Sequence, residues 1–452
     1  MTMTKGGRWF RVVKLAAAVM WLVGMSGLLA MPFFKLSVRL DENALLPLLS
    51  DPTPAHSSEL RIREDHKPTW KEPAGVQKIL GDRGLPSSSS SSSPSSWSDF
   101  ASNSSSGSPC EITSTLLRAK SNPQKQNMLW FVDSEMLPVS LDLMLLLKES
   151  RWLSRDMIFV HVSKSESCEP SATLNAWLEA YHYSGSSDPS WRPESVVPVE
   201  GNIAAAVVLS SDKSGESGAD LMMSINSGTG ILPNLDLVTT FRVIQESLGS
   251  LSLALKGMES CEDGRGQCKA PESLEAYWRS FSCLATFYRR HWMASATDHP
   301  EFRKYNVDAI EVSFNEPISR DIKVEKQRDL VKTLELFARA LNNVEEKLHH
   351  STYTYMLFGT GCGVSTPFAW IWFVVLLQVT VLVTPLADLH HNAPTAHSLA
   401  VDTAAIGFVC FTCLQLFQDP LRVYTLCALV FPLTNLLLWA GADESTGKAK
   451  ES

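Results

Sequence analysis

Carboxylate and imidazole side chains stand at the ends of two apolar runs and could bind a catalytic metal ion. Asp133 follows the run at 128–132, His161 lies near the end of the run at 157–162, and Glu166 is five residues further on. Such side chains hold zinc in hydrolases, and strand ends are where sites form in α/β proteins. Near them the sequence has no His-Glu-x-x-His motif, no His-x-Asp pair and no adjacent glutamates. Solvated loop side chains are the favoured interpretation, with a metalloaminopeptidase site as the alternative.

Two further side chains, Cys168 and Asp402, are of types that could take part in chemistry. Cys168 has no assignable histidine partner, and no Gly-x-Ser-x-Gly turn occurs, so the sequence does not favour nucleophilic catalysis. Asp402 lies in the apolar segment 399–417. A carboxylate within a membrane span is costly unless it is paired or faces a polar cavity. We interpret Asp402 either as a partner or ligand contact or as an interfacial side chain near the end of the span.

The turn at 226–237 (NSGTGILPNLDL) combines glycines, a proline and two polar side chains, Asn234 and Asp236, between leucines. Its favoured interpretation is a loop that leads into a helix, with Asn234 as the N-cap and the leucines in the core. The alternative is that Asn234 and Asp236 contact a partner or ligand.

Cysteine usage depends on the compartment. Cys261 and Cys268 have six residues between them in a Gly-rich loop, within a region expected to lie in an oxidising lumen. This spacing allows a local disulfide between them. Asn103 begins an Asn-x-Ser sequon inside residues 83–109, which hold 15 serines. We expect this Ser-rich stretch to be disordered and Asn103 to be a glycosylation site.

Apolar segments indicate a membrane protein. The chain has 452 residues and a formal net charge of −8, and residues 15–34 and 368–384 contain no ionisable side chain. Each is long enough to cross a hydrocarbon core of about 30 Å. Residues 399–417 and 421–440 are almost as apolar. The first 14 residues carry +4, which predicts a cytosolic N-terminus, a signal anchor and an acidic luminal region. This charge distribution argues against nucleic acid as a partner.

The elements that must position these residues follow from periodicity. Apolar runs alternate with helical patterns, which predicts a parallel α/β core. Strands are expected at 128–132, 157–162, 203–209, 221–225 and 307–314, and helices at 137–145 and 174–183. Leucines, a phenylalanine and a valine spaced by three and four residues predict an amphipathic helix over 326–350.

Six ordered segments resemble one family. They are DENALLP at 41–47, RDMIFV at 155–160, AWLEAYH at 176–182, LPNLDL at 232–237, RKYNVDAIEV at 303–312 and LNNVEEKLHHS at 341–351. In order and spacing they resemble the Gaa family, the GPI anchor attachment subunit of the GPI transamidase complex. The resemblance implies a luminal α/β domain with a zinc-aminopeptidase fold that is not catalytic and holds no cofactor.

The resemblance also implies the setting of the protein. Its partners would be the other GPI transamidase subunits, including the cysteine-protease-like catalytic subunit, together with GPI lipid and the endoplasmic reticulum membrane. The family has more C-terminal membrane helices than the three expected here, so we expect a short form or an incomplete sequence and assign no GPI-binding residue. The alternatives are a membrane-anchored metalloaminopeptidase that uses Asp133, His161 and Glu166, and a luminal adaptor unrelated to GPI.

Together these inferences divide the chain into eight parts. We expect a cytosolic basic N-terminus (1–14), a transmembrane signal anchor (15–34), a luminal post-anchor segment (35–82), a Ser-rich disordered linker (83–109), a luminal peptidase-like α/β domain (110–350), a membrane-proximal joint (351–367), a transmembrane region (368–440) and a cytosolic tail (441–452). The three glycines of GTGCG, between 359 and 363, predict that the joint is flexible.

Overall fold

The computed structural model describes residues 19–20, 22–40, 73–85, 87–89, 108–109, 111–122, 125–163, 168–183, 201–212, 218–225, 232–261, 268–293, 301–315, 320–344 and 353–365. Residues 19–20 and 22–29 are helical. None of the helices within these ranges has the length and apolar character needed to cross a membrane. The predicted spans between 368 and 440, the motif at 41–47 and the predicted tail lie outside the described residues.

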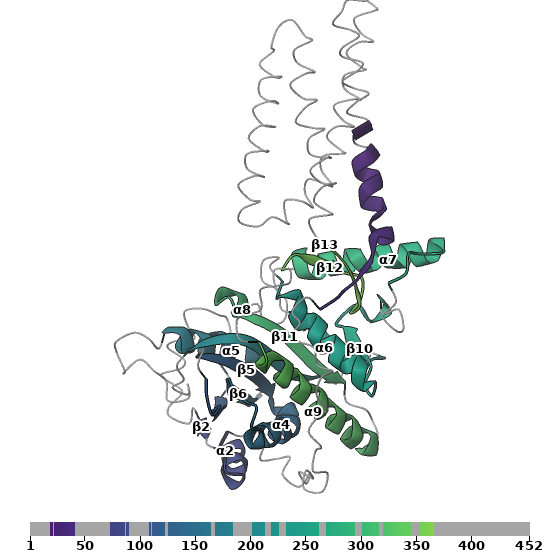
Figure 1. Ribbon diagram of the computed structural model, residues 1–452. Helices are drawn as coiled ribbons and strands as arrows, with labels where there is room; N and C mark the ends of the chain where they lie inside the picture. The colour runs from purple at the N-terminus through teal and green to yellow at the C-terminus, as the bar shows by residue number, and fades with distance from the viewer. Residues whose placement is uncertain are drawn as a thin grey trace, which may run out of the picture.

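A mixed sheet of eight strands forms the centre of the molecule (Figure 1). Its order is β10 (Leu253–Leu255), β9 (Leu221–Ile225), β11 (Asp308–Asn315), β8 (Asn202–Asp212), β5 (Gln126–Asp133), β6 (Asp156–Ser163), β4 (Glu111–Leu117) and β2 (Ser87–Ser89). The four strands β11, β8, β5 and β6 are parallel, whereas β9 and β4 run antiparallel to their neighbours β11 and β6. The predicted α/β core and its five strands are confirmed, but one of the five, β9, is antiparallel to β11, so the sheet is mixed and not wholly parallel.

Side-chain alternation along the strands produces two cores, one on each face of the sheet. On β5, Trp130 belongs to one core and Phe131 to the other, because successive side chains point to opposite faces. Apolar side chains of α2 (Pro73–Asp82), α4 (Leu137–Glu149), α6 (Leu235–Leu248) and α9 (Arg320–Asn342) cover the first face. Those of α5 (Pro170–Tyr183) and α8 (Glu301–Lys304) cover the second. The domain is thus a three-layer α/β/α sandwich.

Helix α9 differs from its predicted bounds, since it begins at Arg320 and ends at Asn342. Its apolar stripe is buried as expected, but the chain leaves the helix after Asn342. The Asn342 side chain accepts hydrogen bonds from the backbone N–H groups of Ser154 and Arg155. The Arg155 guanidinium donates to the carbonyls of Leu341 and Val344. These side-chain bonds satisfy carbonyl groups at the helix end and so permit termination there.

The Ser-rich stretch is structured at both ends, so the prediction of a disordered linker is wrong there. Ser87–Ser89 forms β2, which extends the central sheet by pairing with β4. Ser108–Pro109 forms β3, which pairs with β7 (Cys168–Glu169) in a small separate sheet. Backbone pairing at a sheet edge does not require apolar side chains, which explains how serines form strands here. The serines between these strands, and Asn103, lie outside the described residues.

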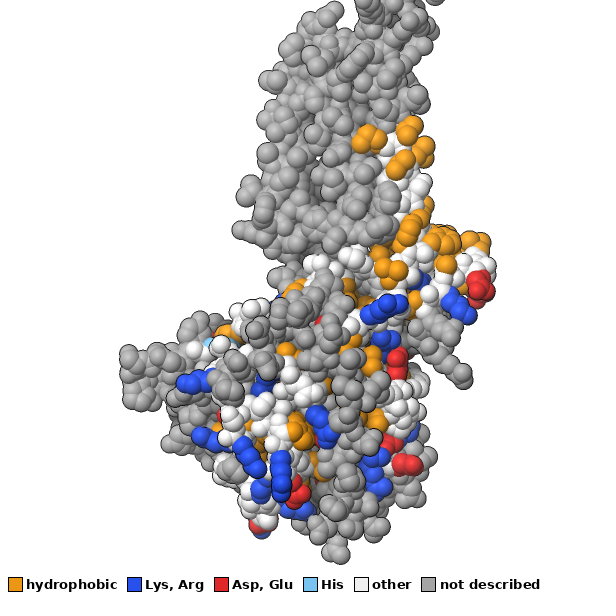
Figure 2. All heavy atoms as spheres, viewed as in Figure 1, with side chains coloured by type: hydrophobic (Ala, Val, Ile, Leu, Met, Phe, Trp, Pro, Cys, Tyr) orange, Lys and Arg blue, Asp and Glu red, His pale blue; other side chains and the backbone are white. Residues whose placement is uncertain are grey.

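A second unit joins the two ends of the described chain. After the N-terminal helix come η1 (Met31–Phe34) and β1 (Leu36–Ser37), and β1 pairs with β13 (Cys362–Ser365), which pairs with β12 (Tyr355–Leu357). Beside them lie η7 (Glu259–Cys261), α7 (Leu274–Tyr288) and the π-helical turn η8 (Arg289–Met293). We call residues 29–38, 268–288 and 353–365 the junction unit. Figure 2 shows apolar side chains from the N-terminal helix continuing onto this unit.

Candidate functional site

The predicted metal ligands point to opposite faces of the sheet. His161 follows Val160 of the second core and shares its face with Phe159 of the first core. Asp133 follows Val132 of the first core, so its side chain emerges on the other face. Strand register places Val132 beside His161, which makes Asp133 and His161 neighbours in the backbone only. They cannot bind a common ion, and the proposed Asp133, His161 and Glu166 ligand set is wrong; Glu166 itself lies outside the described residues.

His161 is a buried structural side chain. Its Nε2 lies 2.9 Å from the Ser140 hydroxyl of α4, and its ring stacks beside Phe159 with the centroids 6.5 Å apart. Burial lowers the pKa of His161 to about 4, against a smaller opposing effect from the Thr113 carbonyl. The ring is therefore neutral at neutral pH. Among the residues that the structure describes, no group of three His, Cys, Asp or Glu side chains could hold a metal ion.

The turn before α6 has the capping geometry that the sequence favours. Asn234 is the N-cap, and its side-chain oxygen accepts a hydrogen bond of 2.9 Å from the backbone N–H of Asp236. Leu232 and Leu237 are fully buried. Asp236 is also buried, in the first turn of the helix, where a carboxylate is favourable. Contact of Asn234 or Asp236 with a partner or ligand stays a prediction.

Polar groups from two distant segments hold this turn in place. The backbone N–H of Asn234 donates to Asp308 at 3.2 Å, and Asp308 forms an ion pair of 2.8 Å with Arg303. The Tyr355 hydroxyl donates to the carbonyl of Pro233 at 3.0 Å. Burial raises the pKa of Tyr355 well above its ordinary range, with Asp308 adding to the effect, so the hydroxyl stays a donor. The turn therefore links the core to strand β12 of the junction unit.

Motif residues of α5 contact the same region. The Tyr181 hydroxyl donates to the carbonyl of Gly201 at 3.0 Å and accepts from the Asn127 amide at 2.8 Å. The His182 ring stacks on Tyr305 with the ring centroids 4.5 Å apart. Tyr305 lies between the ion-paired Arg303 and Asp308 in sequence. Three of the segments that resemble one family are thus in contact through their polar and aromatic side chains.

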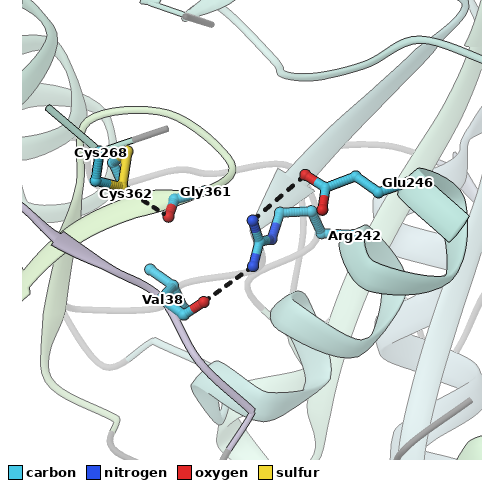
Figure 3. The surroundings of a disulfide bond; sticks show 6 residues. All are labelled: Val38, Arg242, Glu246, Cys268, Gly361 and Cys362. Atoms are coloured by element: carbon cyan, nitrogen blue, oxygen red, sulfur yellow. Dashed lines mark hydrogen bonds and ion pairs between the residues drawn. A yellow bond between two sulfur atoms is a disulfide. The ribbon is translucent and has the colours of Figure 1, made fainter. Parts of the chain in front are cut away.

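The disulfides differ from the predicted pairing. Cys261 bonds to Cys283 of α7, and Cys268 bonds to Cys362 of β13 (Figure 3). The prediction that Cys261 and Cys268 pair with each other is wrong. Each of these cysteines has its partner on another element. The Cys268–Cys362 bond joins residues 94 apart in sequence, which spacing rules for local loops do not detect.

Strand β1 is anchored between α6 and the loop before β13. Arg242 of α6 donates to the carbonyl of Val38 at 2.9 Å and pairs with Glu246 at 3.3 Å (Figure 3). The backbone N–H of Val38 donates to the carbonyl of Gly361 at 3.0 Å. A side chain at Gly363 would meet Leu357, Met356 and Val38 atoms between 3.1 and 3.2 Å away. The GTGCG segment therefore spans the turn between β12 and β13 and the start of β13, and the expectation of a flexible joint is wrong for the paired residues 355–357 and 362–365.

Large apolar side chains are exposed on the junction unit, and the sequence analysis did not single them out. On α7, Leu274 is 73% exposed and Trp278 is 55% exposed. On η1, Phe33 is 52% exposed and stacks on Tyr277 with a centroid distance of 5.6 Å. The signal was present in the sequence, since the aromatic residues of 274–288 occupy too wide an arc for one buried face. Predicted site residue Asp402 lies outside the described residues.

The fold is an α/β domain with the junction unit beside it, and the comparisons show the family to which the chain belongs. The model of the family described as Gaa1-like, GPI transamidase component, matches residues 132–395. The chain belongs to this family. It is 27% identical over 214 residues to GPI transamidase component GAA1 of Saccharomyces cerevisiae. That alignment covers 46% of this chain and 30% of the yeast protein, so the chain matches less than a third of the length of this relative.

Solved structures give weaker likenesses. The bottromycin maturation enzyme BotP has a TM-score of 0.32 and 10% identity, over 60% of this chain and 65% of that chain. Glutaminyl cyclase of Porphyromonas gingivalis has a TM-score of 0.24 and 11% identity, over 59% of this chain and 84% of that chain. The aminobenzoyl-glutamate utilization protein of Klebsiella pneumoniae has a TM-score of 0.28 and 8% identity, over 74% of this chain and 98% of that chain. Scores of this size do not establish a common fold.

Proposed function

We propose that this chain is a non-catalytic subunit of GPI transamidase that supports attachment of GPI anchors to proteins in the endoplasmic reticulum membrane. The observation that carries the proposal is the family match over residues 132–395, which extends from the central sheet through the junction unit. In this role the chain presents GPI lipid and helps to assemble the complex, while a cysteine-protease-like subunit performs the cleavage.

Two features support a role without catalysis by this chain. Asp133 and His161 point to opposite faces of the sheet, so they do not form the ligand pair of a metallopeptidase. The buried His161 ring bonds to Ser140 and has a lowered pKa, which suits a structural residue better than a general base near neutral pH. We therefore propose a peptidase-like domain that has a supporting role in the complex.

Co-purification tests assembly. The tagged full-length chain, extracted from endoplasmic reticulum membranes in mild detergent, should recover the cysteine-protease-like subunit in a fixed ratio. An unrelated tagged protein of the same membrane is the control for carry-over. Recovery of the chain without any other transamidase subunit would sink the proposal.

Complementation tests the role in cells. Loss of the gene should deplete GPI-anchored proteins from the cell surface, and the parent chain should restore them. The Asp133→Asn variant should restore them equally well, since Asp133 is half-buried at a strand end and has no proposed catalytic task. Normal surface levels after gene loss would support the adaptor unrelated to GPI. If the Asp133→Asn variant folds and assembles but does not restore GPI-anchored proteins to the cell surface, the result would support a catalytic role for this chain.

A further inference from the structure

Helix α7 has a second apolar stripe beside the one that packs into the protein. Its buried side chains include Cys283, Leu284 and Phe287. Leu274, Trp278 and Phe281 follow at spacings of four and three residues, so they share one flank of the helix. Leu274 and Trp278 are more than half exposed, and Phe281 is partly exposed. The structure thus leaves uncovered an apolar flank, defined here as the α7 stripe.

The α7 stripe continues the apolar surface of the N-terminal helix. The Tyr277 hydroxyl donates to the carbonyl of Leu29 at 2.8 Å, which fixes the start of α7 against the end of that helix. Phe33 stacks on Tyr277 below this contact. Large apolar side chains of the preceding helix and turn are exposed, namely Val19, Leu22, Val23, Leu29, Phe33 and Phe34. Figure 2 shows apolar side chains along this helix and again in the region of α7, with other atoms between them.

The two helices lie in the directions that a bilayer surface would impose. In Figure 1, α7 crosses the end of the N-terminal helix, which rises away from the α/β domain. An apolar helix along the membrane normal and an amphipathic helix in the membrane plane have this arrangement. The exposed polar side chain of Arg279 lies on another flank, because it follows Trp278 by one residue, or about 100° around the helix.

A crevice between the two helices is also apolar. It has a volume of about 570 Å³ and is open to the outside. Its lining includes the apolar and aromatic residues Leu29, Phe33, Leu274 and Tyr277, together with the polar Glu272 and Ser273 near the start of α7. Tyrosine and tryptophan side chains with an apolar body and a polar edge are typical of membrane–water interfaces. This mixture of mainly apolar and some polar side chains suits the boundary between acyl chains and headgroups.

The stripe is held in position covalently. The bond between Cys261 and Cys283 ties the buried side of α7 to η7. The bond between Cys268 and Cys362 ties the segment before α7 to β13. Both attachments restrain the helix on its protein side, so the exposure of the opposite flank is a fixed property of the fold.

We infer that α7 lies in the headgroup layer of the membrane, with Leu274, Trp278 and Phe281 at the boundary with the acyl chains. This inference rests on the proposed function, which places the chain at the endoplasmic reticulum membrane, and it adds the surface that faces the lipid. The luminal domain then has one defined orientation to the bilayer, with the junction unit nearest to it.

Quenching by brominated lipid tests this placement. An environment-sensitive fluorescent amino acid is introduced into the full-length chain at Trp278, and in a second protein at the exposed Arg279 on another flank of the same helix. Each is reconstituted in nanodiscs of phosphatidylcholine, with or without bromines on the acyl chains. Quenching at 278 should exceed that at 279 at least about threefold, as expected for a helix lying in the interface. Equal quenching at both positions, or none at either, would overturn the inference.

A second measurement separates a protein partner from lipid. The same labelled chains are examined within the purified transamidase complex in the same nanodiscs. Retained quenching at 278 supports lipid contact, whereas its loss on assembly would overturn the inference in favour of a subunit that covers the stripe. Intact folding is checked by resistance of the four paired cysteines to maleimide. Failure of co-purification with preserved quenching would contradict the proposed function and leave the membrane contact standing.

Discussion

Two tryptophans on two helices show how the α/β core and the junction unit differ. Trp177 of α5 is completely buried in the core, whereas Trp278 of α7 is 55% exposed. The buried charges of Arg303 and Asp308 in the core are also paired with each other. These core side chains therefore make their contacts within the chain. The junction unit presents apolar side chains outward, which makes it the part built for contact with its surroundings.

The two regions also depend on different interactions for stability. The core buries apolar side chains on both faces of an eight-stranded sheet. The junction unit has a sheet of three short strands. One disulfide within it joins Cys268 to Cys362, and another joins its helix α7 to Cys261 of η7. Small units with little core commonly need such covalent links. The core should therefore be sensitive to buried polar substitutions, and the junction unit to reduction.

The largest effect is expected from breaking the buried polar network of the core. Asp308→Ala should lower the free energy of unfolding by about 4 kcal/mol, because it leaves the Arg303 guanidinium and the Asn234 N–H without their partner. Denaturation of the full-length protein in detergent measures the change. Asp329→Ala, which removes a more exposed pair with Lys332, is the control and should cost less than about 1 kcal/mol. A similar loss of unfolding free energy in both variants would contradict the expected difference between the buried and the more exposed ion pair.

Removal of the longer disulfide should affect the junction unit first. The double variant Cys268→Ser with Cys362→Ser should lose about 3 kcal/mol of stability, because the unfolded chain regains the freedom of a 94-residue loop. Amide hydrogen exchange should accelerate in β13 and α7 before it does in β5 and β8. Reduction of the parent protein should give the same pattern. Uniform acceleration across both regions would argue against a separate junction unit.

The core should weaken in acid through His161. A histidine whose pKa falls from 6.5 to about 4 on folding contributes stability above pH 6.5 that is lost as the pH falls toward 4. Between pH 7 and pH 5 this loss amounts to about 2 kcal/mol. His161→Leu should remove that much of the change in the free energy of unfolding between pH 7 and pH 5. The Ser140 hydroxyl should keep its hydrogen bond to the Leu137 carbonyl in this variant. An unchanged pH profile in the variant would exclude His161 as the cause.

The smallest effect is expected on the exposed stripe. Trp278→Ser should change the free energy of unfolding in detergent by less than about 0.5 kcal/mol, since the side chain is more than half exposed. Trp177→Ala, at the buried position, should cost about 4 kcal/mol and serves as the matched comparison. A large loss for Trp278→Ser would mean that the stripe packs within the protein and does not face lipid.

Periodicity predicted the core well because its strands and helices are long and buried on defined faces. The strands around 128–132, 157–162 and 307–314 and the buried stripe of α9 follow directly from this pattern. The end of α9 was misplaced because Arg155, which is distant in sequence, bonds to Asn342 and to the Leu341 carbonyl where the helix ends. Strand β4 was missed since its buried Thr113, Ser114 and Thr115 break the apolar alternation.

The candidate site was predicted less well than the fold, for physical reasons. Asn234 as a cap is a local property and was confirmed. The pairing of Cys268 with Cys362 depends on how α7 and β13 are placed in three dimensions, which local spacing does not encode. Similarly, Asp133 and His161 are close in the sheet, but only strand register shows that they point to opposite faces.

The pairing of β1 with β13 has a consequence for the order of synthesis. Leu36 and Ser37 emerge early, but their partners, Gly363 and Cys362, are made near the end of the described chain. Strand β1 must therefore wait unpaired while the entire α/β domain is translated. The junction unit can therefore close only after the intervening domain has been made. Its closure brings the two ends of that domain together at one place.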